Sequence, residues 1–560
     1  MDSRRDFIRK AGGLGLLAFG GCRCSAGRVR KAGGLGLLAF GGCRCSAGCV
    51  REDAVSPNYW CTWGIQNRML GKVQRSPLAF AGDQGAARAR DNINEDLVFG
   101  KGGWTGLFPK SRNRLWMMLD DGWDVPYGTL SRVSTVDFAL MDPYPARFPS
   151  LGATRRARLT NLNGRLVEAG WRGAGLWVAC QCHGESDCLS YVPSGKVRAE
   201  WRAKIEDCAA AGIGYLKVDW GMRSGSVGFR RMLSELVREI APGMIVEHKP
   251  MWSHPFNYVK VLKESERVGG PGRMLDALRA EVNPEDDYDR QVFAFSDVVR
   301  IYDLLRPLDR TTALERVAAF SELIDGNGFG TMLNVEDVPT LGAILGHAFG
   351  VMRSDGNDLS EVDRAVAWQA LAPAFGGRPD FKTAFSDETL TDEWRYARGE
   401  GWLEAVWEKL VYQKAPAVIA RGTALAEVRS REAERPYVLS GRHPNGALAV
   451  GTMPRLTGGR SWTPIADIAL EEEAREGMPL AVFGALGSLT LRDGAPRARV
   501  YARDLLGKEF EDITAACRRR DGRLALPGDV LGRIGTRGAP NETAPAGSLV
   551  VLSDGRERLG

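Results

Sequence analysis

Carboxylates and cations close two short apolar runs in the middle of this 560-residue chain. One run ends in Asp120 and Asp121, and a later run carries Lys217 and ends in Asp219. A cation beside a carboxylate keeps it ionised, whereas apolar surroundings keep a carboxyl group protonated. Acids and bases at the ends of several such runs are candidates for one site in which charged side chains do the chemistry.

Two more apolar runs end in charged side chains. Glu247 and Lys249 close one of them, and Arg300 and Asp303 close the other. A single aspartate after a strand is often only a helix cap or a turn residue. Charge at four strand ends of one chain instead favours a common site.

Tryptophans adjoin these polar strand ends. Trp63, Trp123 and Trp220 each lie next to them in the sequence. Indole rings stack on the apolar faces of sugars, and binding pockets combine aromatic walls with a few polar groups. Tryptophans interleaved with carboxylates therefore favour a carbohydrate pocket.

The elements that must position these residues read as eight short β-type runs alternating with helical patterns. The predicted strands are 59–63, 115–119, 175–180, 215–218, 244–247, 298–301, 331–335 and 348–352. The helical patterns between them include 159–169, 199–211, 228–240 and 312–323. This alternation predicts an α/β fold of the (β/α)₈ barrel type, whose chemistry sits on the loops after the strands. No Gly-x-Gly-x-x-Gly element follows the first strand, so a dinucleotide site has no support.

Composition and texture divide the chain into three parts. We expect a leader at 1–50, a catalytic barrel at 51–398 and a C-terminal domain at 399–560. The last part reads as short alternating strands broken by Gly, Pro and Asp, which predicts an antiparallel β-sandwich. Its strands are predicted at 436–440, 447–451, 488–491, 499–502 and 548–552.

Four of these motifs resemble those of the α-galactosidase (melibiase) clan of glycoside hydrolases. Leu-Asp-Asp-Gly-Trp at 119–123 resembles its second-strand motif, and Tyr-Leu-Lys-Val-Asp-Trp at 215–220 its fourth-strand motif. Arg-Ile-Tyr-Asp at 300–303 and Trp-Cys-Thr-Trp at 60–63 are similar to the sixth-strand and opening motifs. The resemblance implies a barrel with a β-sandwich behind it.

The resemblance also implies a role for each matching residue. Asp219 would be the nucleophile and Asp303 the acid and base of a double displacement that cleaves terminal α-galactosyl or related sugars. Retention requires the two carboxyl groups to lie ~5 to 5.5 Å apart. The residues expected to bind the glycoside substrate are Trp63, Asp120, Asp121, Trp123, Lys217, Trp220, Glu247, Lys249 and Arg300.

Two points stay open within this interpretation. Arg300 and Asp303 are three residues apart where the clan more often shows four, so Asp297 competes with Asp303 as the acid and base. The fifth-strand segment 247–250 does not match the loop with which α-galactosidases read the second carbon of the sugar. The sugar and its linkage therefore remain open.

Two other classes of function fit the same residues. Asp120, Asp219 and Glu247 with Lys217 could form the divalent-metal site and lysine base of an enolase-type lyase acting on a sugar acid. A non-catalytic sugar-binding barrel would keep the pocket and lack turnover. The hydrolase reading itself needs no metal ion or cofactor.

The first 50 residues predict export. Arg4 and Arg5 precede a short Gly- and Leu-rich run, as in a twin-arginine signal, which would place the mature protein in the periplasm or outside the cell. The run is too short to span a bilayer. Residues 9–27 recur identically at 30–48, and Cys22 or Cys43 is a candidate lipid anchor.

Charge and cysteine content limit which binding partners and which disulfides we expect. The formal charge of +6 comes from the leader, so the nearly neutral remainder gives no argument for nucleic acid binding. Cys180, Cys182 and Cys188 cluster and could pair with one another or with Cys208 in an exported protein. Residues 257–295, rich in charge, are expected to form either an insertion over the mouth of the site or a solvated surface loop. The oligomeric state stays open.

Overall fold

The computed structural model describes most of the chain after the leader. The described residues are 55–71, 83–129, 138–181, 192–221, 223–249, 287–301, 307–352, 359–396, 409–539 and 545–555. They belong to one compact unit, Ala47–Gly560. The leader, Asp303, Cys182, Cys188 and most of 257–295 lie outside the described residues.

Eight parallel strands form the first sheet, in the order β7-β6-β5-β4-β3-β2-β1-β8. Their bounds are β1 (Tyr59–Cys61), β2 (Trp116–Leu119), β3 (Gly173–Val178), β4 (Tyr215–Val218), β5 (Ile245–His248), β6 (Val298–Arg300), β7 (Met332–Asn334) and β8 (Gly350–Val351). A parallel bridge between Asn334 and Ala348 joins the two edges. The sheet is thus a nearly closed barrel, and all eight predicted strands are present.

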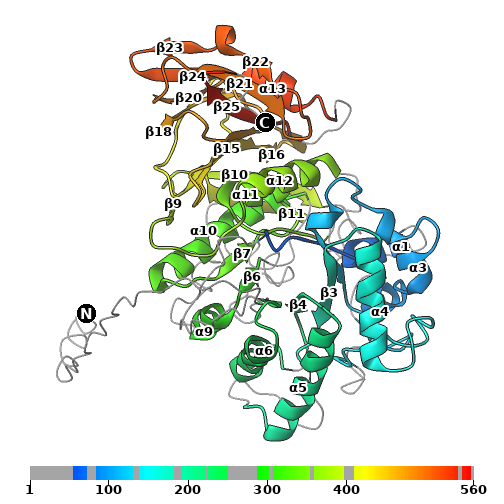
Figure 1. The fold of residues 1–560 in the computed structure, drawn as a ribbon. Helices are drawn as coiled ribbons and strands as arrows, with labels where there is room; N and C mark the ends of the chain where they lie inside the picture. Colours follow the sequence, from blue (N-terminus) through cyan, green and yellow to red (C-terminus); the bar gives the residue numbers. More distant parts are fainter. Residues whose placement is uncertain are drawn as a thin grey trace, which may run out of the picture. The chain divides into compact units, whose positions relative to one another are not determined.

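Helices follow the strands and surround the barrel (Figure 1). They are α1 (Trp63–Gly71), α2 (Asp83–Asp91), α3 (Glu95–Phe99), α4 (Arg155–Glu168), α5 (Gly195–Ala210), α6 (Val227–Ile240), α9 (Asp287–Phe295), α10 (Asp309–Asn327), α11 (Pro339–Leu345) and α12 (Leu359–Leu371). Three begin at a hydroxyl cap, because Thr154, Ser194 and Ser226 each accept a hydrogen bond from the backbone three residues on. These caps fix where α4, α5 and α6 start after their loops.

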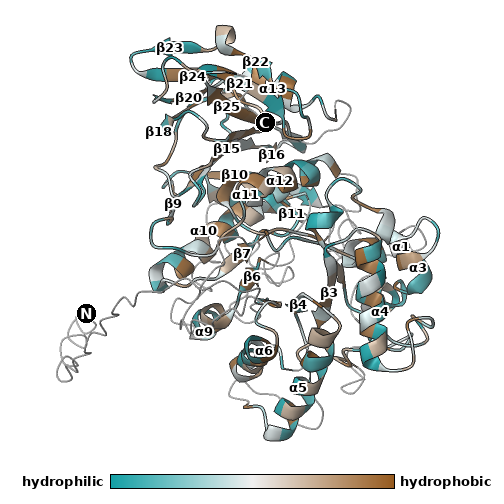
Figure 2. Ribbon diagram, viewed as in Figure 1, coloured by the Kyte–Doolittle hydropathy of each residue, from teal (hydrophilic) through white to brown (hydrophobic). Residues whose placement is uncertain are grey.

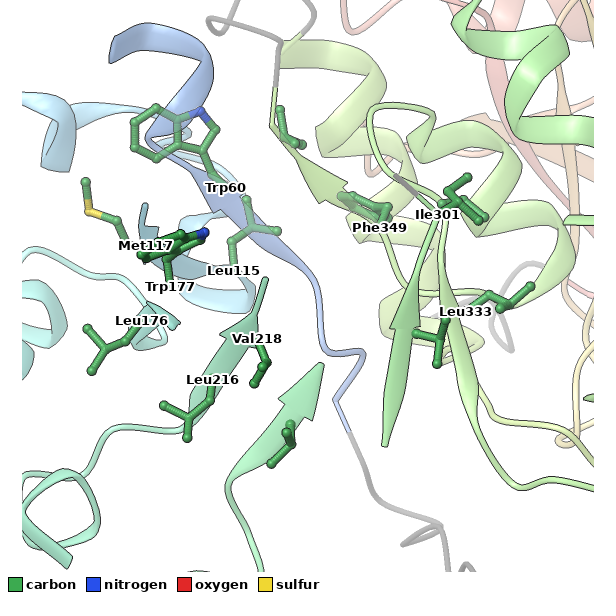
Figure 3. Close-up of a cluster of buried hydrophobic side chains, with 14 of the residues drawn as sticks. Trp60, Leu115, Met117, Leu176, Trp177, Leu216, Val218, Ile301, Leu333 and Phe349 are labelled. Atoms are coloured by element: carbon green, nitrogen blue, oxygen red, sulfur yellow. The ribbon is translucent and has the colours of Figure 1, made fainter. Parts of the chain in front are cut away.

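The strands alternate between the two faces of the barrel wall. On β4, Leu216 and Val218 belong to a cluster of buried hydrophobic side chains (Figure 3), and the same cluster includes helix residues such as Leu162 of α4 and Leu233 of α6. Tyr215 and Lys217 lie on the opposite face, because successive side chains of a strand point to opposite sides. The same alternation places Asp219 in the direction of Lys217, toward the barrel interior.

A β-rich region follows the barrel. One sheet has the order β22-β21-β25-β19-β15-β14-β12-β9, and a second has β13-β18-β20-β24-β23. The bounds of the first sheet, in chain order, are β9 (Thr383–Phe385), β12 (Val418–Arg421), β14 (Tyr437–Arg442), β15 (Leu448–Met453), β19 (Leu480–Phe483), β21 (Arg499–Asp504), β22 (Glu511–Asp512) and β25 (Gly547–Ser553). Those of the second are β13 (Glu427–Ser430), β18 (Ala466–Ala474), β20 (Ser488–Asp493), β23 (Arg518–Arg520) and β24 (Arg523–Pro527).

These two sheets share a core of their own. Val438, Val450 and Val482 of the first sheet are buried in one cluster with Leu489 and Leu524 of the second. Most neighbouring strands are antiparallel, whereas β12–β14, β15–β19 and β18–β20 run parallel. Two small hairpins, β10 (Thr389–Tyr396) with β11 (Lys409–Pro416) and β16 (Arg455–Thr457) with β17 (Arg460–Trp462), and the helix α13 (Gly528–Gly535) complete the region.

The β-rich region is joined to the barrel through α11 and α12. Arg421 on β12 donates to the carbonyl oxygens of Leu345 and Gly346, at 3.0 and 3.1 Å. These carbonyls end α11, where a cation is favourable. Strand β9, in the first of these sheets, and β10, which pairs with β11, both precede the predicted boundary at 398. Neither was predicted, because their partly polar sequences do not stand out as strands.

Hydropathy follows this layering. Helices α4 and α5 show both hydrophilic and hydrophobic colours along their length in Figure 2, as expected for amphipathic helices with one face toward solvent. Among the described residues, no helix has the length and apolar character that crossing a membrane requires.

Candidate active site

A polar layer crosses the interior of the barrel. Glu247 on β5 accepts hydrogen bonds from the hydroxyl groups of Tyr59 (3.0 Å) and Tyr215 (2.7 Å) and from the amide of Asn334 (2.6 Å). Its side chain is fully buried. Glu247 was predicted to bind substrate, and the structure instead commits both of its oxygens to barrel residues.

Arg300 on β6 connects this layer to the strand ends above it. Its guanidinium lies 3.3 Å from Glu247, 3.5 Å from Glu336 and 3.1 Å from Asp219. Burial alone would lower the pKa of Arg300, but these carboxylates raise it well above its usual value. Arg300 is therefore a permanent cation shared by three strands of the barrel.

Asp219 lies directly after β4 and is almost fully buried. Its Oδ2 accepts a hydrogen bond from the indole of Trp177 at 3.0 Å and faces Arg300 at 3.1 Å. Burial would raise the pKa of Asp219, but Arg300, Lys249 and Lys217 together hold that pKa well below its usual range. These cations therefore favour the ionised form of the Asp219 carboxyl group.

The second oxygen of Asp219 is placed differently. Oδ1 is buried and has no hydrogen-bond partner among the described residues. Buried carboxylate oxygens are nearly always hydrogen-bonded, so an exception calls for an explanation. An ionised carboxylate with one oxygen held and one oxygen unengaged is the arrangement that a nucleophile needs.

Lys217 and Asp120 form the adjoining pair. The Lys217 ammonium donates to Oδ2 of Asp120 at 2.5 Å, and the Cys61 thiol donates to the same oxygen at 2.9 Å. Burial lowers the pKa of Lys217, but the nearby Asp120 outweighs this and raises it. Both of these donors therefore meet at the same oxygen, Oδ2 of Asp120.

Asp121 has a different task from Asp120. Its two oxygens each lie 2.8 Å from Nε of Arg90, and burial raises its pKa to about 6 against the opposing effect of Arg90. Gly122 follows with φ +117°, and a side chain there would meet the Arg90 carbonyl. Asp121 and Gly122 thus anchor the loop that carries Asp120.

Lys249 directly follows β5 and continues its parallel pairing with β4. Its backbone N–H donates to the Val218 carbonyl at 3.1 Å, which brings the residue beside the end of β4. Its ammonium is one of the cations that lower the pKa of Asp219. Lys249 therefore belongs to the positive surroundings of the nucleophile candidate.

The three predicted tryptophans differ in burial: Trp63 and Trp123 are buried, and Trp220 is half-buried. Trp123 is fully buried, and its N–H donates to the Trp177 carbonyl at 2.9 Å. Trp63 is 8% exposed in a cluster with Cys61. Trp220 is half-buried and packs against Trp177 with ring centroids 5.6 Å apart. The expected sugar platform is wrong for Trp123, whose ring is fully covered by the core.

The two candidates for the acid and base lie in different situations. Asp303 is outside the described residues. Asp297 precedes β6, accepts the Val246 N–H at 2.9 Å and faces Arg238 at 3.6 Å. It lies at the amino end of the barrel strands, whereas Asp219 lies at their carboxyl end. This position speaks against Asp297 as the partner of Asp219.

The structure adds residues that the sequence did not single out. Trp177 lies within a predicted strand, and only the direction of its side chain reveals its contact with Asp219. Glu336 follows β7 and faces Arg300. Glu336 directly follows the predicted strand 331–335, the same pattern that identified the other strand ends. Cys61 was noted only as part of a motif.

The carboxylates proposed for a metal site are already paired. Asp120 faces Lys217, and Asp219 and Glu247 both face Arg300. Among the described residues, no cluster of three or more His, Cys, Asp or Glu side chains could hold a metal ion. Each carboxylate thus has a protein cation where a metal-binding carboxylate would need the ion.

One cysteine expectation can be assessed. Cys208 is a buried thiol without a disulfide, and burial raises its pKa to about 12. The predicted alternative in which it pairs with the cysteine cluster is therefore wrong. Cys182 and Cys188 lie outside the described residues.

Comparison with known proteins gives the following matches. No protein-family model matches the chain, and a search of curated proteins gave no match. Among solved structures, the chain is similar to a β-L-arabinopyranosidase of glycoside hydrolase family 27 from Geobacillus stearothermophilus, with 13% identity, 89% of this chain and 97% of that chain covered, and a TM-score of 0.38.

Two further structures indicate how broad the likeness is. A proposed α-galactosidase/melibiase from Bacteroides fragilis shares 12% identity over 65% of this chain and 78% of its own, with a TM-score of 0.31. Orotidine 5′-phosphate decarboxylase from Lactobacillus acidophilus shares 9% over 56% of this chain and 97% of its own, with a TM-score of 0.25. At these values the functional argument rests on the site itself.

Proposed function

We propose that the chain is a retaining glycoside hydrolase that cleaves terminal α-galactosyl or related sugar residues. One observation carries the proposal: Asp219 is held ionised at the end of β4 by Arg300, Lys217 and Lys249, and its Oδ1 accepts no hydrogen bond from any residue that the structure describes. Buried carboxylates usually have raised pKa values, so a lowered one requires positive charges placed for that purpose.

The reaction follows from the roles of two carboxyl groups. Asp219 attacks the anomeric carbon and forms a glycosyl-enzyme, while protonated Asp303 donates its proton to the leaving oxygen. Deprotonated Asp303 then accepts a proton from water, which attacks the same carbon and releases the sugar. Configuration is retained because two inversions occur at one carbon.

Substrate binding would use the neighbouring pair. Oδ2 of Asp120 is occupied by Lys217 and Cys61, which orients Oδ1 for a sugar hydroxyl. The Lys217 ammonium also contacts the sulfur atoms of Cys61 (3.6 Å) and Met352 (3.4 Å), and a sugar hydroxyl would replace one of these weak acceptors. Glycosides of galactose, or of the related pentose L-arabinose, are the substrates we expect first.

The rival functions fit these observations less well. In a metal-dependent lyase, the carboxylates would face an ion, whereas here they face Lys217 and Arg300. A sugar-binding barrel without turnover needs no ionised carboxylate with an unengaged oxygen.

Export through the twin-arginine route remains part of the proposal and would place the enzyme in the periplasm or outside the cell.

A panel of nitrophenyl glycosides tests the proposal. Wild-type protein should release nitrophenol from α-galactoside or an L-arabinoside, with and without EDTA, and Asp219→Ala should not. Asp297→Ala is the matched control, because it removes a carboxylate from the other end of the same barrel. Cleavage of no glycoside by the wild type, or equal activity of Asp219→Ala, would reject the hydrolase.

A further inference from the structure

We infer that Trp177 determines which oxygen of Asp219 attacks the sugar, by holding Oδ2 through its indole N–H so that Oδ1 faces the anomeric carbon. The inference rests on the proposed function and deepens it. Trp177 does not touch the substrate in this scheme and acts through Asp219, so it is a positioning residue.

The position of Trp177 follows from strand register. Trp177 on β3 pairs with Lys217 on β4, and both side chains lie on the inner face of the barrel. Asp219, two residues further along, lies within reach of the indole, and the hydrogen bond measures 3.0 Å. Trp177 itself is 1% exposed, so no water competes for its N–H.

The chemistry of the indole makes this contact selective. An indole nitrogen donates one hydrogen bond and accepts none. It can therefore hold a carboxylate oxygen but cannot accept a hydrogen bond from a protonated one. Arg300 approaches the same oxygen at 3.1 Å. Among the described residues, a hydrogen-bond donor and a cation thus meet at Oδ2 while no donor reaches Oδ1, which gives the two oxygens different roles.

The rest of the fold fixes Trp177 in place. Trp123 on the loop after β2 donates its N–H to the Trp177 carbonyl at 2.9 Å. The Trp177 ring also packs against Trp220, which directly follows Asp219. Buried Trp123 thus supports β3 at the residue that holds the nucleophile. Reactive groups need such rigid support, because small displacements slow a reaction strongly.

The test compares two Trp→Phe substitutions. Trp177→Phe keeps an aromatic ring and removes the N–H that Asp219 accepts. Trp201→Phe is the matched control, because Trp201 on α5 is equally buried and its N–H has no hydrogen-bond partner among the described residues. Thermal unfolding of both variants reports whether loss of indole volume alone destabilises the fold.

The probe is an α-galacto-configured cyclophellitol epoxide, which alkylates the nucleophile of a retaining enzyme. The carboxylate oxygen forms a bond to the epoxide carbon, the carbon–oxygen bond of the epoxide breaks, and its oxygen takes a proton from the acid. Mass spectrometry gives the labelled residue, the maximal inactivation rate and the half-saturating probe concentration.

We expect Asp219 to be labelled in the wild type. In Trp177→Phe the maximal rate should fall about 10- to 100-fold, the cost of a misplaced reacting group, while the half-saturating concentration stays close to that of the wild type. Trp201→Phe should keep both values. If Trp177→Phe does not fold, replacing Trp177 by β-(3-benzothienyl)alanine removes only the N–H and carries the same expectation.

The contrary outcomes distinguish the role of Trp177 from the proposed hydrolase function. Unchanged labelling in Trp177→Phe, or an equal loss in Trp201→Phe, overturns the role of Trp177 and leaves the hydrolase intact. A wild type that cleaves glycosides but is labelled at another residue also overturns it. A wild type that neither cleaves glycosides nor reacts overturns the proposed function together with the inference.

Discussion

The carboxylate of Asp219 and the guanidinium of Arg300 lie 3.1 Å apart, with both side chains nearly or fully buried. They come from β4 and β6, strands that are separated by β5 in the barrel. Between them, Glu247 on β5 faces the same guanidinium. The relationship explains how a carboxylate can remain ionised inside the protein, because a buried charge is stable only when it is paired.

Arg300→Met should destabilise the fold and abolish activity. The substitution leaves Asp219, Glu247 and Glu336 without their shared cation, and breaking a buried ion pair costs about 3 to 5 kcal/mol. Urea unfolding would measure the loss. Arg238→Met is the control, because the Arg238 pair with Asp297 is about half exposed and such pairs contribute about 0 to 1 kcal/mol. Equal losses in the two variants would contradict the role given to Arg300.

Asp124→Asn should stabilise the protein at pH 8 but not at pH 4. Burial raises the pKa of Asp124 from 3.8 to about 7. The folded state therefore binds a proton more tightly than the unfolded state, and this contribution to stability falls as the pH rises from about 4 to about 7.

Asparagine removes this pH-dependent cost and can still accept the Met141 N–H that Asp124 accepts at 3.1 Å. The gain at pH 8 should approach about 2 to 4 kcal/mol, from the size of the shift. Denaturant unfolding of both proteins across this pH range provides the measurement. A gain that is the same at pH 4 and pH 8 would show that Asp124 does not titrate in this window.

Asp303→Asn and Asp297→Asn should differ sharply. Loss of a general acid lowers the rate by about 100- to 10,000-fold, and least for substrates with acidic leaving groups such as dinitrophenol. Asp297 lies at the opposite end of the strands, so its substitution should leave kcat and the pH profile unchanged. The reverse pattern of kcat values would assign the proton transfer to Asp297.

How much of this could be predicted from the sequence depends on the kind of feature. The strand β4 was predicted with its exact bounds, because an apolar run ends sharply at Asp219. Barrel architecture then placed Asp120, Lys217, Asp219 and Arg300 at one site, since the carboxyl ends of parallel strands meet at one edge.

Other features depend on tertiary contacts that no local pattern records. Glu247 was predicted to bind the substrate from a strand end. Its oxygens instead accept hydrogen bonds from Tyr59 and Asn334, which are far from it in the sequence. Trp123 was predicted to stack on the sugar, but its side chain is fully buried in the core. Strand β13 is short and mostly polar, so its sequence does not predict a strand. It is a strand because it pairs with β18.

Replacing Arg4 and Arg5 by lysine should block export. The twin-arginine pair is read as a specific address, so two lysines keep the charge and lose the signal. Fractionation of cells that express each form would locate the protein. The wild type should reach the periplasm or medium and the Lys-Lys variant should stay inside, while equal export of both would assign the leader to another route.

The identity of the nucleophile is tested most directly by azide rescue of Asp219→Ala. Azide occupies the space of the missing carboxylate and attacks the anomeric carbon once, without a covalent enzyme intermediate. We predict that azide restores turnover of an activated α-galactoside and that NMR shows a β-galactosyl azide. A wild type that releases β-galactose first, or an Asp219→Ala variant that azide does not revive, would contradict a double displacement through Asp219.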